Sequence, residues 1–398
     1  MKKFAVALLT SVAFVEVIVI LIFYKYTNRI NGVKGKWIAQ GEQESQGNFA
    51  RNFTTLLQMN KEGALNENST EVMSLKNIST RCSQLTFGFV SHITQPRFEE
   101  TSQNPFLLVM ITSGVKNSYR TRRNGVRNTW GNEVNHQALR VWKRVFVLGK
   151  TPDSLLENEI NQESTMFNDI LVLNITDNYD NLVIKSYSGL LWGLVHVNPQ
   201  FILKADDDVY VRIPYLVSWL EYYATDRFYG GHVIPGGADV RRTSNMKNRV
   251  ARDCMEEDHY APYCSGAYYV VSSNALPLIF QSMHKWTAIP VEDAYMGLLA
   301  RESGLKPVDI PGFEFRNIRD YGRCNWASAV ALGHNYDILQ YTYIQSKLQE
   351  HSHLPRYHYE CLATEWAGFI LIIVIPSSVI IILCTVVKVR SWQRHSSR

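Results

Sequence analysis

The sequence lacks the signatures of several common protein classes. Its six cysteines include no C-x-x-C pair, so a structural zinc site is not expected. The net charge is only +5 over 398 residues, and no basic run has interleaved aromatics, so nucleic acid is not an expected partner. Residues 149–151 read GKT, but Arg144 stands where a P-loop needs its first glycine. With 46% hydrophobic residues, the chain is suited to one large domain with appendages.

Two long apolar runs stand near the ends of the chain, at residues 4–24 and 367–387. Each is long enough to cross a hydrocarbon core of about 30 Å, so each predicts a membrane span. The first run is followed by KYTNRI and no small-residue cleavage site, which favours an uncleaved signal anchor. The tail 388–398 has basic residues and no acid, so we expect this tail and residues 1–3 to be cytosolic.

The part of the chain between the two spans should then be lumenal. Residues 25–103 are polar with little periodicity, which is typical of a stem and not of a folded core. Cys384 lies in the second apolar run, and an oxidising compartment would pair cysteines among the other five, leaving one over. These five are Cys82, Cys254, Cys264, Cys324 and Cys361. The sequons that we expect to be glycosylated are at Asn52, Asn68, Asn77 and Asn174.

Residues 104–360 form the expected catalytic domain, because short apolar runs alternate there with stretches of helical length. The runs 105–112, 141–149, 169–176 and 201–205 predict strands. Between the last two, residues 181–197 have leucines at helix-like intervals and predict a helix. This rhythm predicts an α/β fold with a mostly parallel sheet flanked by helices. Ligands bind such sheets at the carboxyl ends of the strands.

Three carboxylates, Asp206 to Asp208, directly follow the strand predicted at 201–205. One interpretation is a solvated loop in which one aspartate caps the next helix. An EF-hand calcium loop is excluded, because Val217 stands at the twelfth position, where a glutamate is needed. The remaining interpretation is Mg²⁺ or Mn²⁺, held by one or two carboxylates and shared with the phosphates of a ligand.

Several sequence blocks, taken in order, resemble those of a known family. They read RRNGVRNTWG (122–131), DNYDNLVIKS (177–186), KADDDVYV (204–211), YAPYCSGAYYVVS (260–272) and VEDAYMG (291–297). Through them, the region from about Phe106 to about Tyr343 resembles the β-1,3-galactosyltransferases and β-1,3-N-acetylglucosaminyltransferases. The resemblance implies a GT-A-like fold that binds a nucleotide-diphosphosugar, a Mn²⁺ or Mg²⁺ cofactor, and a lumenal catalytic domain on the Golgi membrane.

The resemblance also implies roles for individual residues. Asp208 is expected to ligate the metal with Asp206 and His334, since a leaving diphosphate needs charge neutralisation. Asp293 is expected to be the base that takes the proton of the acceptor hydroxyl. Its neighbour Glu292 does not share its helix face and is expected to bind the acceptor, together with Tyr268. The residues expected at the donor are Arg122, Arg127, Lys185, Asp206 and Asp207.

The expected reaction is metal-dependent, inverting transfer of galactose from UDP-galactose to the 3-hydroxyl of an acceptor sugar on glycoprotein or glycolipid. The alternative within the family is N-acetylglucosaminyl transfer. An alternative of another class is a catalytically inactive membrane lectin or assembly partner, although the acids that such a protein would lose are present. A glycoside hydrolase is disfavoured, because it needs two carboxylates on opposite sides of the sugar. The second membrane span departs from the family plan of a single anchor.

Overall fold

The computed structural model describes residues 89–98, 104–133, 140–236, 238–243, 249–286, 288–354 and 361. The apolar runs near the two ends, most of the expected stem and its three sequons lie outside these residues. Within the described ranges, no helix combines the length and the apolar character that a membrane crossing needs. The anchors and the stem therefore remain predictions.

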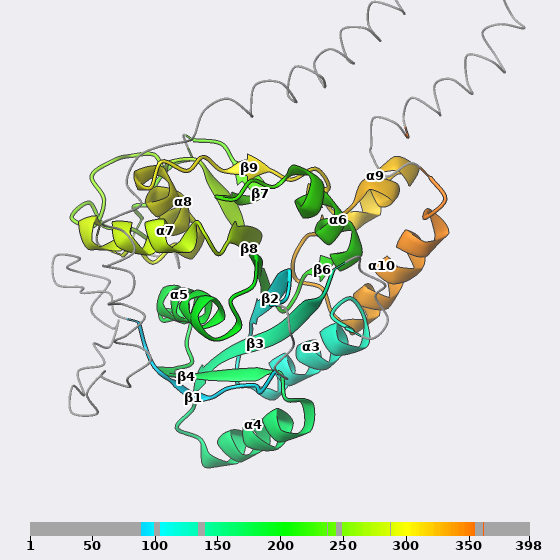
Figure 1. Cartoon of the computed structure of the whole chain (residues 1–398), viewed down its shortest axis with the longest axis horizontal. Coiled ribbons are helices and arrows are strands. Elements are labelled where there is room, and N and C mark those ends of the chain that lie inside the picture. The colour runs from blue at the N-terminus through cyan, green and yellow to red at the C-terminus, as the bar shows by residue number, and fades with distance from the viewer. Residues whose placement is uncertain are drawn as a thin grey trace, which may run out of the picture. The chain divides into compact units, whose positions relative to one another are not determined.

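An eight-stranded sheet forms the centre of the fold, in the order β1-β4-β3-β2-β5-β8-β7-β9 (Figure 1). Its strands are β1 (His92–Thr94), β2 (Leu107–Thr112), β3 (Trp142–Lys150), β4 (Ile170–Thr176), β5 (Phe201–Asp206), β7 (Tyr229–Ile234), β8 (Tyr263–Ser272) and β9 (Val308–Asp309). The four strands expected from the sequence are β2 to β5, and they are mutually parallel as expected. β8 is antiparallel to both β5 and β7, and β1 is antiparallel to β4, so the sheet is mixed, with parallel pairing concentrated in β2 to β5.

The strand β2 is covered on both faces, and all of its residues are buried. Val109 and Ile111 lie in the same hydrophobic core as Trp130. On the other face, Met110 lies so close to Gly189 that a Cβ there would be 2.8 Å from its sulfur. Burial on both faces explains why β2 is a continuous apolar run without alternation.

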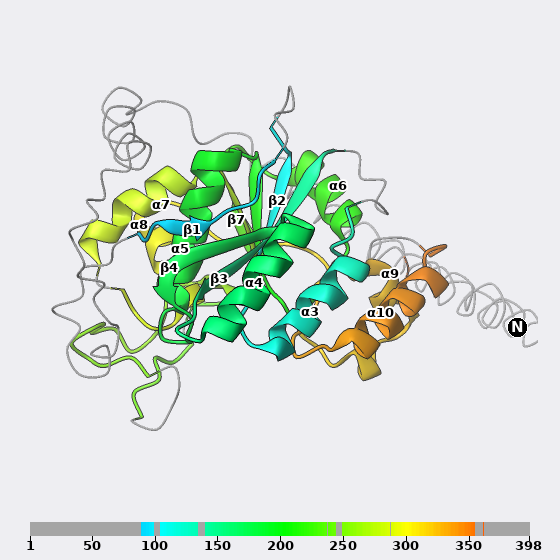
Figure 2. The same ribbon diagram turned by 90° about the horizontal axis from the view of Figure 1, so that it is seen from below.

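Helices cover both faces of the large sheet (Figures 1 and 2). α5 (Leu182–Trp192), α7 (Leu276–Ser282) and α8 (Glu292–Glu302) lie on one side, and α3 (Asn117–Asn128) and α4 (Ser154–Phe167) lie on the other. The helix expected at 181–197 is present and ends in a π-helical turn, Gly193–Val197. α6 (Ile213–Tyr223) follows the three aspartates, and α10 (Ile338–Glu350) packs against α3, where a Cβ on Gly125 would be 3.1 Å from Tyr341.

A second, small sheet connects the C-terminal part of the chain to the aspartate loop. It consists of β10 (Phe313–Glu314), β11 (Ala331–Leu332) and β6 (Tyr210–Val211), in that order. β6 begins two residues after Asp208 and pairs antiparallel with β11. This pairing brings the segment after β11, which contains His334, to the aspartates.

The cysteines and one sequon can be placed. Cys324, in α9 (Arg323–Ser328), forms a disulfide with Cys361, and Cys254 is also disulfide-bonded. Cys264 is the buried free thiol among the described residues. Asn174 lies in β4, where its side-chain oxygen accepts a hydrogen bond from Lys150 Nζ at 2.8 Å, so its glycosylation stays a prediction.

Candidate active site

The three aspartates lie where the sequence predicted them, at the carboxyl ends of the parallel strands. Asp206 is the last residue of β5 and pairs in register with Thr112, the last residue of β2. Thr112 Oγ1 donates a hydrogen bond of 2.8 Å to Asp206 Oδ1. The turns that follow β2 and β5 therefore form one continuous polar edge.

Asp207 is the buried member of the three, with 5% of its side chain exposed. Ser113 Oγ donates to its Oδ2 at 2.6 Å, and Arg122 Nη1 donates to its Oδ1 at 3.2 Å. Burial raises the pKa of Asp207 to about 6, against the opposing effects of Ser113 and Arg122. Both carboxylate oxygens thus have fixed donors, and the side chain is held rigidly.

Asp206 and Asp208 are more open, with 37% and 14% of their side chains exposed. Burial and the charge of Asp206 raise the pKa of Asp208, while Arg122, His334 and the backbone N–H of Asn335 lower it. Negative charge is therefore crowded at Asp208, and a cation there would be stabilised.

The carboxylates at this site fit a divalent cation that is shared with a bound substrate better than one that is ligated by the protein alone. In the part of the chain that the structure describes, no group of three His, Cys, Asp or Glu residues is arranged to hold a metal alone. Mg²⁺ and Mn²⁺ sites commonly use one or two carboxylates and complete their shell with substrate phosphates and water. Asp206 and Asp208 supply such carboxylates, and the exposed His334 lies next to Asn335, whose backbone N–H bonds Asp208.

Of the cations expected at the donor, Arg122 lies beside the aspartates and Lys185 contacts the turn after β2. Arg122 has 35% of its side chain exposed and lies 3.2 Å from Asp207 and 3.5 Å from Asp208. Lys185 in α5 is buried, and its Nζ donates at 2.8 Å both to the carbonyl oxygen of Ser113 and to Asp177. Arg122 is thus available to a ligand, whereas Lys185 holds the turn after β2 in place.

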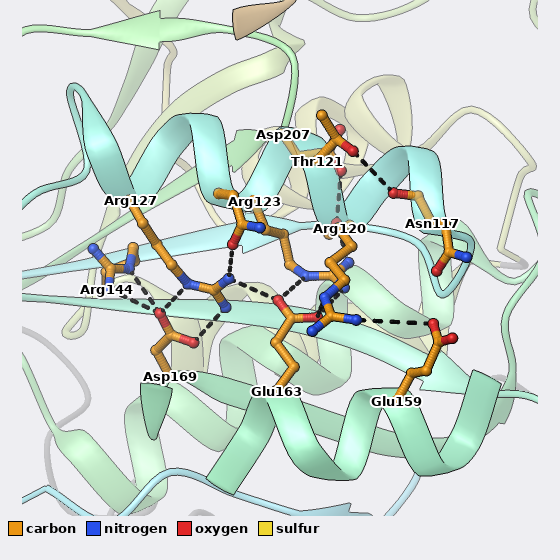
Figure 3. Close-up of polar contacts among 12 residues, drawn as sticks. Asn117, Arg120, Thr121, Arg123, Arg127, Arg144, Glu159, Glu163, Asp169 and Asp207 are labelled. Atoms are coloured by element: carbon orange, nitrogen blue, oxygen red, sulfur yellow. Dashed lines mark hydrogen bonds and ion pairs between the residues drawn. The ribbon is translucent and has the colours of Figure 1, made fainter. Parts of the chain in front are cut away.

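Arg127 is placed differently from the expectation. Its guanidinium is buried between α3 and α4, where it pairs with Asp169 at 2.8 Å and with Glu163 at 2.7 Å (Figure 3). It also donates to Asn124, so its hydrogen-bonding capacity is used inside the protein. These buried acids fix the side chain as an internal ion pair, so the geometry of Arg127 does not support the predicted contact with the donor.

Arg123, which we did not predict, connects this ion-pair network to the site. It makes a bidentate pair with Glu163, at 2.9 Å through Nε and at 2.6 Å through Nη2. Its Nη1 donates to Ser113 Oγ at 3.1 Å, so the Ser113 hydroxyl is left to donate its own proton to Asp207. The sequence signal was the spacing of four between Arg123 and Arg127, which places both on one face of α3.

On the other side of β5, the start of α8 presents Asp293. Gly266 N–H donates to Asp293 Oδ2 at 2.8 Å, and Ala294 N–H donates to Oδ1 at 2.9 Å. Burial raises the pKa of Asp293, although these two backbone donors lower it. A carboxylate that is positioned by the backbone and made more basic by burial is suited to accept a proton.

Glu292 has a separate environment, as expected for successive helical residues. It is 5% exposed, and its Oε1 accepts a hydrogen bond of 2.8 Å from the hydroxyl of Tyr269. Burial raises the pKa of Glu292 to about 7, with Lys204 opposing the shift. So little exposed surface does not fit the predicted contact with an acceptor, because a ligand cannot reach this carboxyl from solvent.

Residues 121–311 match a family profile described as Galactosyltransferase. The β-1,3-galactosyltransferases 1 of Mus musculus and Homo sapiens are 31% identical to the chain over 234 residues, which cover 57% of this chain and 69% of theirs. This chain belongs to the galactosyltransferase family. It is therefore a glycosyltransferase.

Relatives of this galactosyltransferase family member are named for two different sugars. A lactosylceramide 1,3-N-acetyl-β-D-glucosaminyltransferase A of Xenopus laevis is 30% identical over 255 residues, covering 62% of this chain and 67% of its own. Among solved structures, galactosyltransferase LgtC with donor and acceptor sugar analogues matches with a TM-score of 0.35 and 10% identity, over 66% of this chain and 99% of its own.

Tyr268 does not have the position that we expected for an acceptor contact in this galactosyltransferase. The residue is fully buried in β8, and its hydroxyl donates to the carbonyl oxygen of Glu314 at 2.6 Å. Its ring lies 5.0 Å from those of Phe313 and Phe315. Tyr268 therefore joins the large sheet to the small one, and the predicted contact with an acceptor has no exposed surface to support it.

Proposed function

We propose that this galactosyltransferase moves galactose from UDP-galactose to the 3-hydroxyl of an acceptor sugar on glycoprotein or glycolipid, with inversion at the anomeric carbon, in a GT-A-like site. The observation that carries the proposal is the linkage of two acidic centres. Asp206 and Gly266 are both bonded to Lys204, and Gly266 donates to Asp293. A donor-side carboxylate and a positioned base thus lie in one connected site.

The residues on the donor side are of the types that bind a nucleotide diphosphate together with a metal ion. Asp208 and Asp206, with His334, are the residues that would hold Mn²⁺ or Mg²⁺, and the bound cation would neutralise the charge that develops on the leaving diphosphate. Arg122 is a partly exposed cation beside them and adds a charge-assisted hydrogen-bond donor for phosphate oxygens. Asp207 is almost fully buried, and Ser113 and Arg122 occupy both of its carboxylate oxygens, so we assign it to positioning Arg122 for the donor in place of the direct donor contact that the sequence predicted.

The acceptor side needs a base, because a sugar hydroxyl does not ionise at neutral pH. In the proposed step, Asp293 takes the proton of the 3-hydroxyl while that oxygen forms a bond to the anomeric carbon. The bond from that carbon to the UDP oxygen breaks, and UDP leaves with the electron pair. A positioned base of this kind contributes about 10²- to 10⁴-fold in rate.

N-acetylglucosaminyl transfer is the second candidate, because the Xenopus laevis relative carries that name. The two donor sugars differ in the substituent at carbon 2 and in the configuration at carbon 4. An inactive lectin or assembly partner is the candidate of another class. It would bind sugar without consuming UDP-sugar, so turnover separates it from both transferases.

We further propose that the catalytic region lies in the Golgi lumen, between membrane spans at 4–24 and 367–387. The disulfide between Cys324 and Cys361, with the disulfide-bonded Cys254, supports an oxidising compartment. In intact microsomes, added protease should remove tags from both ends of the chain and spare the core. A protected C-terminal tag would exclude the second span.

The proposed base is tested by Asp293→Asn, which keeps the shape of the side chain and removes its basicity. Turnover should fall about 10²- to 10⁴-fold, while affinity for UDP-sugar and the melting temperature stay close to the parent. Asp153→Asn is the matched control, because Asp153 caps α4 on the opposite face of the sheet. Near-parent turnover of a folded Asp293→Asn protein would falsify the assignment.

A further inference from the structure

A lysine is buried inside the central sheet between the two acidic centres. Lys204 lies in β5 and is 1% exposed. Its Nζ donates at 2.7 Å to Asp206 Oδ1 and also donates to the carbonyl oxygen of Gly266. The same Nζ lies 3.9 Å from Glu292 Oε2.

The strand register explains why these groups meet. In the antiparallel pairing of β5 with β8, Lys204 lies opposite Tyr269, so both side chains leave the sheet on the same face. α8 packs against this face and inserts Glu292 between them. Tyr269 binds one carboxylate oxygen of Glu292, and the ammonium group of Lys204 lies near the other.

Gly266 extends this arrangement to the base. Its carbonyl oxygen accepts from Lys204, and its N–H donates to Asp293 at 2.8 Å. The position of residue 266 is therefore fixed from both sides. A shift of Lys204 would move Gly266 and, with it, one of the two backbone donors of Asp293.

We propose that Lys204 is a positioning residue that couples the donor-side carboxylate Asp206 to the base Asp293 through Gly266, with Glu292 and Tyr269 fixing its ammonium group. This inference rests on the proposed function, because it assigns Asp293 as the base. It also gives Glu292 a role that its burial permits, in place of contact with the acceptor.

A purely structural role predicts something different. Buried ion pairs often add little stability compared with apolar residues of similar size. A methionine of similar length at position 204 would then pack into the sheet with little effect on the chemistry. If Lys204 positions the base, the same substitution lowers kcat even when the protein stays folded.

The test is a double-mutant cycle on the full chain, with Lys204→Met, Asp293→Asn and the double variant, followed by kcat, KM and melting temperature. Lys204→Met should lower kcat roughly 10- to 100-fold, as expected for a misplaced catalytic group. In the Asp293→Asn background, it should lower kcat by a clearly smaller factor, because the part of its effect that acts through the base is already lost and only the part through Asp206 remains. Lys143→Met on β3 controls for the loss of a lysine and should keep parental kcat.

Two outcomes overturn the proposal: parental kcat in folded Lys204→Met, or losses that multiply in the double variant. If Lys204→Met does not fold, Lys204→Gln replaces it in the same cycle, since glutamine removes the charge and retains a hydrogen-bond donor. Failure of the proposed function is distinguishable, because there Asp293→Asn alone would keep parental turnover. Multiplying losses on top of an impaired Asp293→Asn protein would contradict only the role of Lys204.

Discussion

Gly266 N–H donates to Asp293 Oδ2 at 2.8 Å, and a Cβ at position 266 would lie 3.1 Å from that same oxygen. The carboxylate therefore fits against a residue without a side chain. Gly266→Ala should push the Asp293 carboxyl away from its donor and lower kcat roughly 10- to 100-fold, since small displacements of catalytic groups cost that much. Steady-state kinetics on the folded variant measure the effect.

Gly322→Ala is the matched control for that prediction. A Cβ at Gly322 would have its nearest neighbour at 3.5 Å, an ordinary contact, and Gly322 has a negative φ of −76°. The control should therefore keep parental turnover. If Gly266→Ala were as active as Gly322→Ala, the contact between residues 266 and 293 would have no catalytic meaning.

Removal of divalent cations should abolish transfer, and Mn²⁺ or Mg²⁺ should restore it. The reason is the crowding of negative charge at Asp206 and Asp208, which raises the pKa of Asp208 and leaves both side chains partly open. Asp208→Asn should need more Mn²⁺ for half-maximal activity than the parent, as measured by titration after chelation. Full activity of the parent in excess chelator would contradict the metal proposal.

Ser113→Ala should weaken donor binding. The substitution removes the 2.6 Å hydrogen bond to Asp207, which has few other donors in its buried position. KM for the UDP-sugar should rise about 3- to 10-fold, corresponding to roughly 1 kcal/mol for a lost hydrogen bond. Ser218→Ala in α6, where the hydroxyl bonds the carbonyl oxygen of Pro214 within its own helix, is the control and should leave KM unchanged. Equal KM values for the two variants would argue against a donor-side role for Asp207.

The buried carboxyl of Glu292 predicts a defined dependence of stability on pH. Its pKa is raised from 4.5 to about 7, so between these values the folded state holds a proton that the unfolded state has lost. Stability should therefore fall as pH rises through this window, by roughly 3 kcal/mol for this group at about 1.4 kcal/mol per pH unit. Denaturation of the parent and of Glu292→Gln at several pH values measures the difference. If the free energies of unfolding of the parent and of Glu292→Gln differ by the same amount at every pH from 4.5 to 8, the pKa of Glu292 is not raised.

Local sequence pattern predicted the parallel half of the sheet, because β2 to β5 are mainly apolar runs of strand length. It did not predict β7, which reads YGGHVI, or the two-residue strands of the small sheet, because their pairing depends on distant partners. The antiparallel placement of β8 follows from such long-range pairing.

The sequence predicted some site residues and not others, because contacts between residues far apart in the chain cannot be seen in a local pattern. Asp206 to Asp208 could be located because they follow a strand directly. The internal ion pairs of Arg127 could not be foreseen, because its partners on α4 and just before β4 are far along the chain. Lys204 itself carries a signal in the sequence. A charged residue inside a strand buried on both faces needs a partner.

The most direct test of the account is a screen of UDP-sugars with the purified chain, with determination of the linkage formed on a galactose- or N-acetylglucosamine-terminated acceptor. The account predicts consumption of UDP-galactose in the presence of Mn²⁺, with galactose joined in β configuration to the 3-hydroxyl. Exclusive use of UDP-N-acetylglucosamine would replace the proposed donor with the second candidate. Sugar binding without turnover of any UDP-sugar would contradict the proposal that Asp293 and the aspartate loop form a working transferase site.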